Sequence, residues 1–94
     1  MKETYYLCLY DNIDDDITKF AEYINVNNLH EYIKFIKIND IHKRWLKHNE
    51  KKIHITVFPV IIKYIKSTYP KLYKLDEQSI IINELKELQN LYGS

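Results

Sequence analysis

The 94-residue sequence predicts a single α/β domain whose strands and helices follow one another in the order β-α-β-α-β-β-α. Short aromatic and β-branched runs alternate with segments whose apolar residues recur at helical spacing. Hydrophobic residues make up 46% of the chain and include nine tyrosines, a composition that forms a packed core and is unlike that of a disordered chain. A chain of this length has room for one such core.

The first strand and the first helix give the clearest signals. Thr4–Tyr10 is short, aromatic and apolar on both faces, which predicts a strand in the middle of a sheet. The next segment has apolar residues on one helix face, namely Ile17, Phe20, Ala21 and Ile24. The carboxylates that can cap this helix are Asp14, Asp15 and Asp16. Asn27–Asn28 is expected to end it, because asparagine tolerates the left-handed conformation.

The next two elements are a strand and a short helix. Glu31–Ile38 fits either type of element, and we interpret it as a strand because of its length and the turn-like Asn39–Asp40 that follows. Asp40 is then expected to cap a helix over Ile41–His48, which leads into the charged loop Asn49–Lys52.

The second half predicts a hairpin and a final helix. Pro59 interrupts a long apolar stretch, so the third strand is expected to start at Val60, and Lys71–Leu75 alternates as its hairpin partner. Asp76 or Ser79 is expected to cap the last helix. The apolar face of this helix repeats at intervals of four, three and four, with Gly93 in the position of a helix-ending glycine: Ile81, Leu85, Leu88 and Tyr92.

This order resembles the thioredoxin-like fold of thioredoxins and glutaredoxins. The resemblance rests on Ile36–Asp40 with the helix around Lys43–Leu46, and on Ile55–Ile62, where a proline opens the next strand. It implies a mixed four-stranded sheet flanked by helices and a cis bond between Phe58 and Pro59. It also implies a protein-docking surface at this end of the fold, formed by Phe58, Pro59, Asp14, Asp15 and Trp45.

The chain departs from that family at the catalytic motif. Thioredoxins and glutaredoxins place Cys-x-x-Cys, or at least one cysteine, between the first strand and the first helix, where this chain has the sulfur-free Asp11–Thr18. Their chemistry needs a thiolate stabilised at a helix N-terminus. The single cysteine, Cys8, lies inside the first strand, where burial is expected to raise its pKa. We therefore expect neither enzymatic activity nor a cofactor, with a thiol oxidoreductase that uses Cys8 as the alternative.

Three other groups of residues are candidate sites. The acidic cluster Asp11, Asp14, Asp15 and Asp16 lacks the spacing of a calcium loop and is interpreted as a solvated helix start. The spacing of His42, His48 and His54 places no pair on one helix face, so we expect no metal site. A basic segment could contact phosphate groups, which makes nucleic-acid binding a further alternative, although no base-reading motif accompanies it: Lys43, Arg44, Lys47, Lys51 and Lys52.

The tyrosines allow two interpretations. They either lie partly buried with their hydroxyl groups in solvent, or they coat an interface with another protein. The tyrosines in question are Tyr5, Tyr6, Tyr10, Tyr64, Tyr69 and Tyr73.

The leading hypothesis is a redox-inactive structural module that binds other proteins. Isoleucine, lysine, asparagine and tyrosine abound, and their codons are rich in A and T, which favours an A/T-rich genome such as that of a large DNA virus, of some protists or of some bacteria. A component of a virus particle or assembly is the most concrete form of the hypothesis. A lone cysteine, without a targeting segment or membrane span, predicts a reducing intracellular compartment and no membrane partner.

Overall fold

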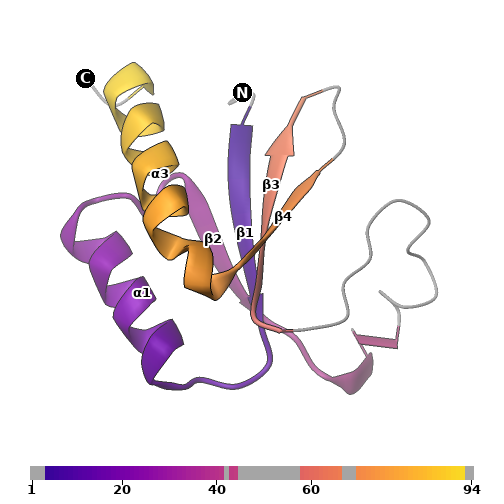
Figure 1. The fold of residues 1–94 in the computed structure, drawn as a ribbon. Coiled ribbons are helices and arrows are strands. Elements are labelled where there is room, and N and C mark those ends of the chain that lie inside the picture. Colours follow the sequence, from indigo (N-terminus) through magenta and orange to yellow (C-terminus); the bar gives the residue numbers. More distant parts are fainter. Residues whose placement is uncertain (1–3, 42, 45–57, 67–69, 93–94) are drawn as a thin grey trace.

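The computed structural model describes residues 4–41, 43–44, 58–66 and 70–92, which form a mixed α/β fold (Figure 1). Four strands make one mixed sheet in the order β2-β1-β3-β4. β1 (Thr4–Tyr10) is parallel to β2 (Ile33–Lys37) and antiparallel to β3 (Val60–Ile65). β4 (Lys71–Lys74) forms a hairpin with β3. The mixed sheet expected from the sequence is therefore present, with β1 at its centre as predicted.

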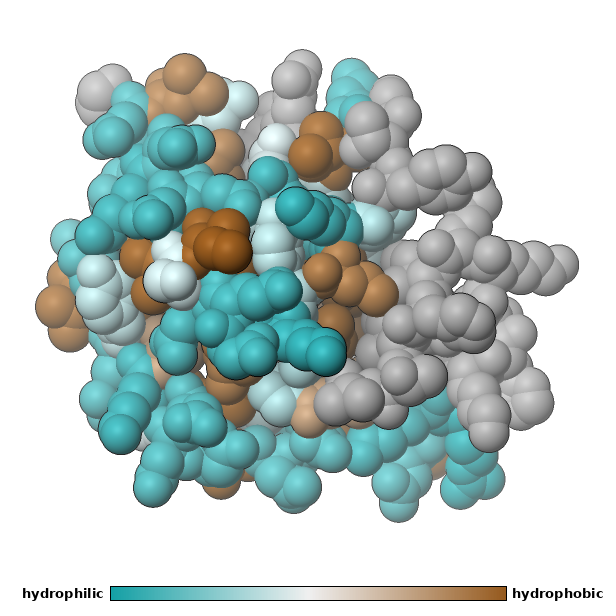
Figure 2. Space-filling model, viewed as in Figure 1, coloured by the Kyte–Doolittle hydropathy of each residue, from teal (hydrophilic) through white to brown (hydrophobic). Residues whose placement is uncertain are grey.

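Two helices, α1 (Asp15–Val26) and α3 (Gln78–Tyr92), cover the same side of the sheet (Figure 1). Alternate side chains of the strands point to this side, where Tyr6 and Cys8 of β1 pack in one core cluster with Phe20 of α1 and Leu85 of α3. The outer surface over the two helices is mainly hydrophilic, with hydrophobic side chains scattered among polar ones (Figure 2). A second core cluster lies on the other face of the sheet and contains Leu9, Ile38, Val60 and Ile62.

Helix α1 begins and ends as the sequence predicts. The Ile17 N–H donates to the Asp14 carboxylate at 2.9 Å, which makes Asp14 the N-cap among the three candidate aspartates. At the other end Asn28 has φ 57°, the left-handed conformation expected of an asparagine after a helix. Residues within or next to α1 thus mark both of its ends, and Gln89 of α3 also donates to the Asn27 carbonyl at 3.1 Å.

The elements after α1 required two corrections. β2 is shorter than the predicted Glu31–Ile38, although the Ile38 N–H still donates to the Tyr10 carbonyl at 2.9 Å. Asp40 does not cap the short helix, because it is itself helical together with Ile41, Lys43 and Arg44. The Lys43 N–H donates to the Asn39 carbonyl at 3.0 Å, so the helix starts one residue earlier than expected.

The second half matches the prediction at β3 and differs after β4. β3 begins at Val60 as expected, and the Phe58–Pro59 bond before it is cis. Leu75 is not in β4 but opens the 3₁₀ turn η1 (Leu75–Glu77), which continues directly into α3. The predicted caps are therefore wrong, since Asp76 lies within η1 and Ser79 within the helix.

The apolar face of α3 is also shorter than its repeat suggests. Ile81 and Leu85 are buried and Leu88 packs against them, whereas Tyr92 is 47% exposed. No helix in the ranges that the structure describes is both long enough and apolar enough to cross a membrane.

Candidate functional site

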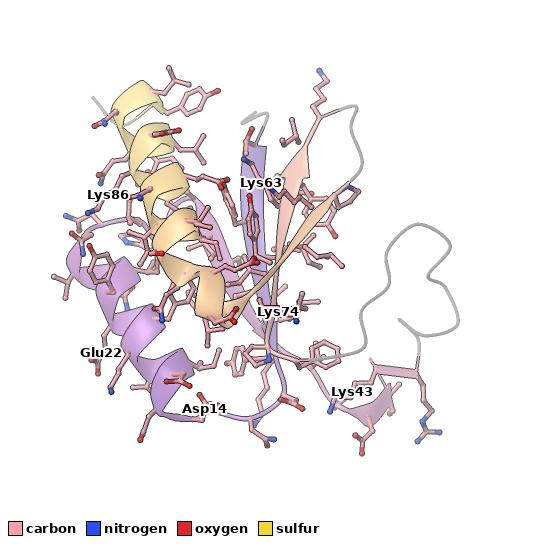
Figure 3. The ribbon with its side chains drawn as sticks, in the orientation of Figure 1. Asp14, Glu22, Lys43, Lys63, Lys74 and Lys86 are labelled. Atoms are coloured by element: carbon pink, nitrogen blue, oxygen red, sulfur yellow. The ribbon has the colours of Figure 1, made fainter. Side chains whose placement is uncertain are left out.

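The candidate site lies at the end of the sheet where α1 begins. Asp11 follows β1, Lys43 lies in the short helix after β2, and Phe58–Pro59 precedes β3. The Lys43 ammonium donates to Asp11 Oδ2 at 2.8 Å and lies 5.5 Å from the centroid of the Phe58 ring. We call Asp11, Lys43, Phe58 and Pro59 the sheet-end cluster. Figure 3 shows Asp14, the cap of α1, at the same end of the molecule as Lys43.

The sheet-end cluster joins three segments that lie far apart in the sequence. Hydrogen bonding to Lys43 is the main reason why the pKa of Asp11 is lowered. The two side chains keep 28% (Asp11) and 36% (Lys43) of their surface exposed, and Phe58 and Pro59 are half-buried. The cluster is thus a partly accessible surface that offers a charge pair, an aromatic ring and a proline.

The only cysteine of the chain does not reach this surface. Cys8 is fully buried in the middle of β1, and desolvation raises the pKa of its thiol to about 12. The expectation of a buried and weakly acidic thiol is confirmed. At neutral pH a thiol with this pKa holds almost no thiolate, which is the species that attacks a disulfide.

The four aspartates of the acidic cluster have different roles. Asp14 caps α1 and Asp11 pairs with Lys43, whereas Asp15 and Asp16 are exposed in the first turn of the helix. Within the described residues no three histidine, cysteine, aspartate or glutamate side chains come together in a way that could hold a metal ion.

Part of the predicted binding surface cannot be placed. Lys43 and Arg44 are the basic residues of the predicted patch that the structure describes, and Arg44 is exposed. The other predicted residues lie outside the described ranges: Trp45, Lys47, Lys51 and Lys52, the histidines His42, His48 and His54, and Tyr69.

A second polar group lies between α3 and the sheet, and sequence reasoning missed it. The Glu84 carboxylate of α3 accepts hydrogen bonds from Tyr6 at 2.7 Å, from Lys63 at 2.6 Å and from Tyr73 at 2.8 Å. These donors come from β1, β3 and β4, so one carboxylate contacts three strands. We call these four residues the Glu84 cluster; Figure 3 shows Lys63 pointing to the side of the sheet that α3 covers.

The pKa shifts in the Glu84 cluster follow from burial and hydrogen bonding. Desolvation raises the pKa of Glu84, but the bonds from Lys63, Tyr6 and Tyr73 outweigh it and hold the pKa below its usual value. Desolvation, followed by hydrogen bonding to Glu84, raises the pKa of Tyr73 to about 12 and also raises that of Tyr6. The cluster therefore favours a charged carboxylate beside neutral tyrosines.

A pocket of about 180 Å³ adjoins the Glu84 cluster and is lined by Lys63, Glu84 and apolar residues near the end of α3. Because every member of the Glu84 cluster has a partner inside it, the cluster is explained by its role in holding α3 on the sheet. The hydroxyl groups of Tyr6 and Tyr73 thus reach a carboxylate and not solvent, contrary to the first interpretation of the tyrosines.

The other described tyrosines differ in position. Tyr5 and Tyr64 stack on the opposite face of the sheet with ring centroids 5.0 Å apart, and Tyr5 is 46% exposed. Tyr10 lines a groove beside α1.

Comparison with known proteins found no matching family model, no similar curated protein and no similar solved structure.

Proposed function

We propose that this chain is a redox-inactive thioredoxin-like domain that binds other proteins through the sheet-end cluster. Three features support the fold assignment. Among the described strands the sheet order is β2-β1-β3-β4 with one parallel pair, α1 and α3 share one face, and Phe58–Pro59 stands directly before β3. These features agree with the element order on which the resemblance rests.

One observation carries the functional part of the proposal. At the end of the sheet where α1 begins, the surface is formed by Asp11, Lys43 and Phe58, while the only thiol is buried inside β1. A charge pair and an aromatic ring recognise other surfaces but cannot exchange disulfides. The exposed Asp15 and Asp16 beside them favour a partner segment with basic residues next to an apolar side chain.

The binding surface can be tested with a photoactivatable amino acid placed at Ile13, which is 66% exposed just before α1. Val26 is 79% exposed at the opposite end of the same helix and is the matched control. In cells that naturally produce the protein, we expect specific adducts from position 13 that weaken when Phe58→Ala is added. Equal adducts from both positions would refute the sheet-end surface.

The absence of dithiol chemistry is tested separately. We expect no reduction of insulin, and we expect Cys8 to be alkylated only as fast as the domain unfolds, because its side chain has no exposed surface. Alkylation in urea should rise in parallel with the unfolding curve. Catalytic turnover that disappears in Cys8→Ser would show instead that the domain is a thiol oxidoreductase.

The setting that we propose is the particle or an assembly of a large DNA virus, in a reducing intracellular compartment. The support is compositional: the chain is rich in residues with A/T-rich codons and has one glycine and one cysteine. Mass spectrometry of purified particles would detect the chain at a fixed ratio to other structural proteins, and its absence from them would contradict this setting.

A further inference from the structure

The outer edge of β2 carries backbone groups that point away from the sheet. The Tyr6 N–H donates to the Tyr32 carbonyl at 3.0 Å and the Ile38 N–H to the Tyr10 carbonyl at 2.9 Å. Alternate residues of a strand direct their backbone N–H and C=O groups to the same neighbouring strand. The backbone groups of the even-numbered residues of this segment therefore point toward β1. The N–H and C=O groups of Ile33, Phe35 and Lys37 therefore point outward, and β1 is the one described strand that pairs with β2.

A groove follows this edge on the side of the helices. It has a volume of about 250 Å³ and is lined by Phe35 and Tyr10 of the sheet and by Ala21, Glu22 and Asn25 of α1. Figure 3 shows Glu22 on the side of α1 that faces away from α3. The edge thus offers hydrogen bonds to an extended strand, and the groove offers space for side chains that such a strand carries on its helix side.

The sequence of β2 favours a second copy of the same strand as the partner that pairs with this edge. In antiparallel pairing centred on Phe35, the backbone N–H and C=O groups of Phe35 would form hydrogen bonds with those of Phe35 in the second copy. Lys34 then lies opposite Ile36, and Lys37 lies opposite Ile33, so that no two lysines face each other. A register shifted by two residues would instead place Lys34 opposite its own copy, which is unfavourable.

The charges beside the edge fit the same arrangement. The Phe20 ring lies 5.7 Å from the Phe35 ring, so Ile24, one helical turn later, lies level with Ile33. Glu22 lies between these two levels on the outer side of α1. Lys37 of a second copy, opposite Ile33 and on the helix side of the sheet, would therefore extend toward the groove that Glu22 lines. Both side chains are exposed, and neither forms an ion pair within the described part of the chain.

We propose that the chain forms a symmetric dimer through antiparallel pairing of β2 with β2 about Phe35, which joins two sheets into one of eight strands. The surface involved is the β2 edge and not the sheet-end cluster. Dimerisation and partner binding can therefore fail independently of each other.

The charge complementarity is tested by sedimentation over a range of concentrations. The wild-type chain is expected to sediment as a dimer, Glu22→Lys to raise the dissociation constant about tenfold, and Glu22→Lys combined with Lys37→Glu to restore it. Glu87→Lys, an exposed change on α3, is the matched control and should leave the dimer unchanged. A wild-type chain that stays monomeric up to its solubility limit overturns the proposal.

The register is tested with two single-cysteine additions, Lys34→Cys and Ile36→Cys, which are mixed before oxidation. Residues 34 and 36 of the two copies form a non-hydrogen-bonded pair with Cα atoms about 4.5 Å apart, within the range of a disulfide. Residue 34 is about 8 Å from its own copy, too far for a disulfide. The mixture should therefore give a covalent dimer, and Lys34→Cys alone should not. Cross-linking of Lys34→Cys alone, or none in the mixture, overturns the proposed pairing.

Discussion

Glu84 shows at the scale of one residue how a charge is kept inside this fold. Both the Glu84 and Lys63 side chains retain about a fifth of their surface, 21% and 20%, while Tyr6 and Tyr73 are buried. Taking such groups out of water is unfavourable, and the hydrogen bonds to the carboxylate offset that cost. Without the carboxylate, the Lys63 ammonium would lie unpaired beside two buried hydroxyl groups.

Glu84→Ala is therefore expected to lower the free energy of unfolding by about 3 kcal/mol, the lower end of the range for breaking a buried ion pair, because the pair is not fully buried. Urea denaturation measures the change. Glu87→Ala, an exposed residue one turn further along α3, should change stability by no more than about 0.5 kcal/mol. Equal effects of the two substitutions would argue against the role assigned to Glu84.

At the scale of elements, the limits of helix α1 are set by signals in its own sequence. Its cap, its apolar face and its terminal asparagine all lie within residues 14–28. β1 and the start of β3 were likewise predictable, from an apolar run and from Pro59. The end of β4 was not, because whether Leu75 continues a strand or opens η1 depends on the packing of α3.

The side-chain pairs that sequence reasoning missed share one physical cause, which is that they depend on contacts across the fold. Tyr6 and Glu84 are 78 residues apart, and Asp11 and Lys43 are 32 apart, so no local pattern pairs them. A signal for the contact between Glu84 and Lys63 was present, since Glu84 lies on the helix face of Ile81 and Leu88. Lys63 similarly interrupts an apolar strand. A single charge on each of two apolar faces that pack together indicates an ion pair between them.

The cap of α1 gives a prediction at this scale. Asp14→Ala is expected to lower stability by about 1 kcal/mol, because the Ile17 N–H loses its acceptor, whereas Asp14→Asn keeps an oxygen there and should lose much less. Thermal unfolding of the three proteins provides the measurement. A similar loss in both variants would mean that the charge matters and the cap bond does not.

At the scale of the whole molecule, the titrating groups define the pH range in which the fold is stable. The pKa of Glu84 and that of Asp11 are lowered in the folded state, so their contribution is complete above the unfolded value of about 4 and is lost as the pH falls through the folded value. The pKa of Tyr73 is raised to about 12, so its contribution is complete below about 10 and is lost as the pH rises toward 12.

We therefore expect the free energy of unfolding to be nearly constant between about pH 5 and 9 and to fall on both sides. Urea denaturation across this range would show it. Glu84→Gln should flatten the acid side, and Tyr73→Phe should flatten the alkaline side. An acid slope that is unchanged in Glu84→Gln would show that other carboxylates determine it.

The contacts of Glu84 have a consequence for how the chain is made. Synthesis runs from the N-terminus, so Tyr6, Lys63 and Tyr73 leave the ribosome before the carboxylate that satisfies all three. Until α3 emerges, these polar groups face water, and so does the apolar side of the sheet that Ile81 and Leu85 later cover. The sheet is therefore fully stabilised only after α3 has been translated. A nascent chain would expose an apolar surface that chaperones bind until α3 has left the ribosome.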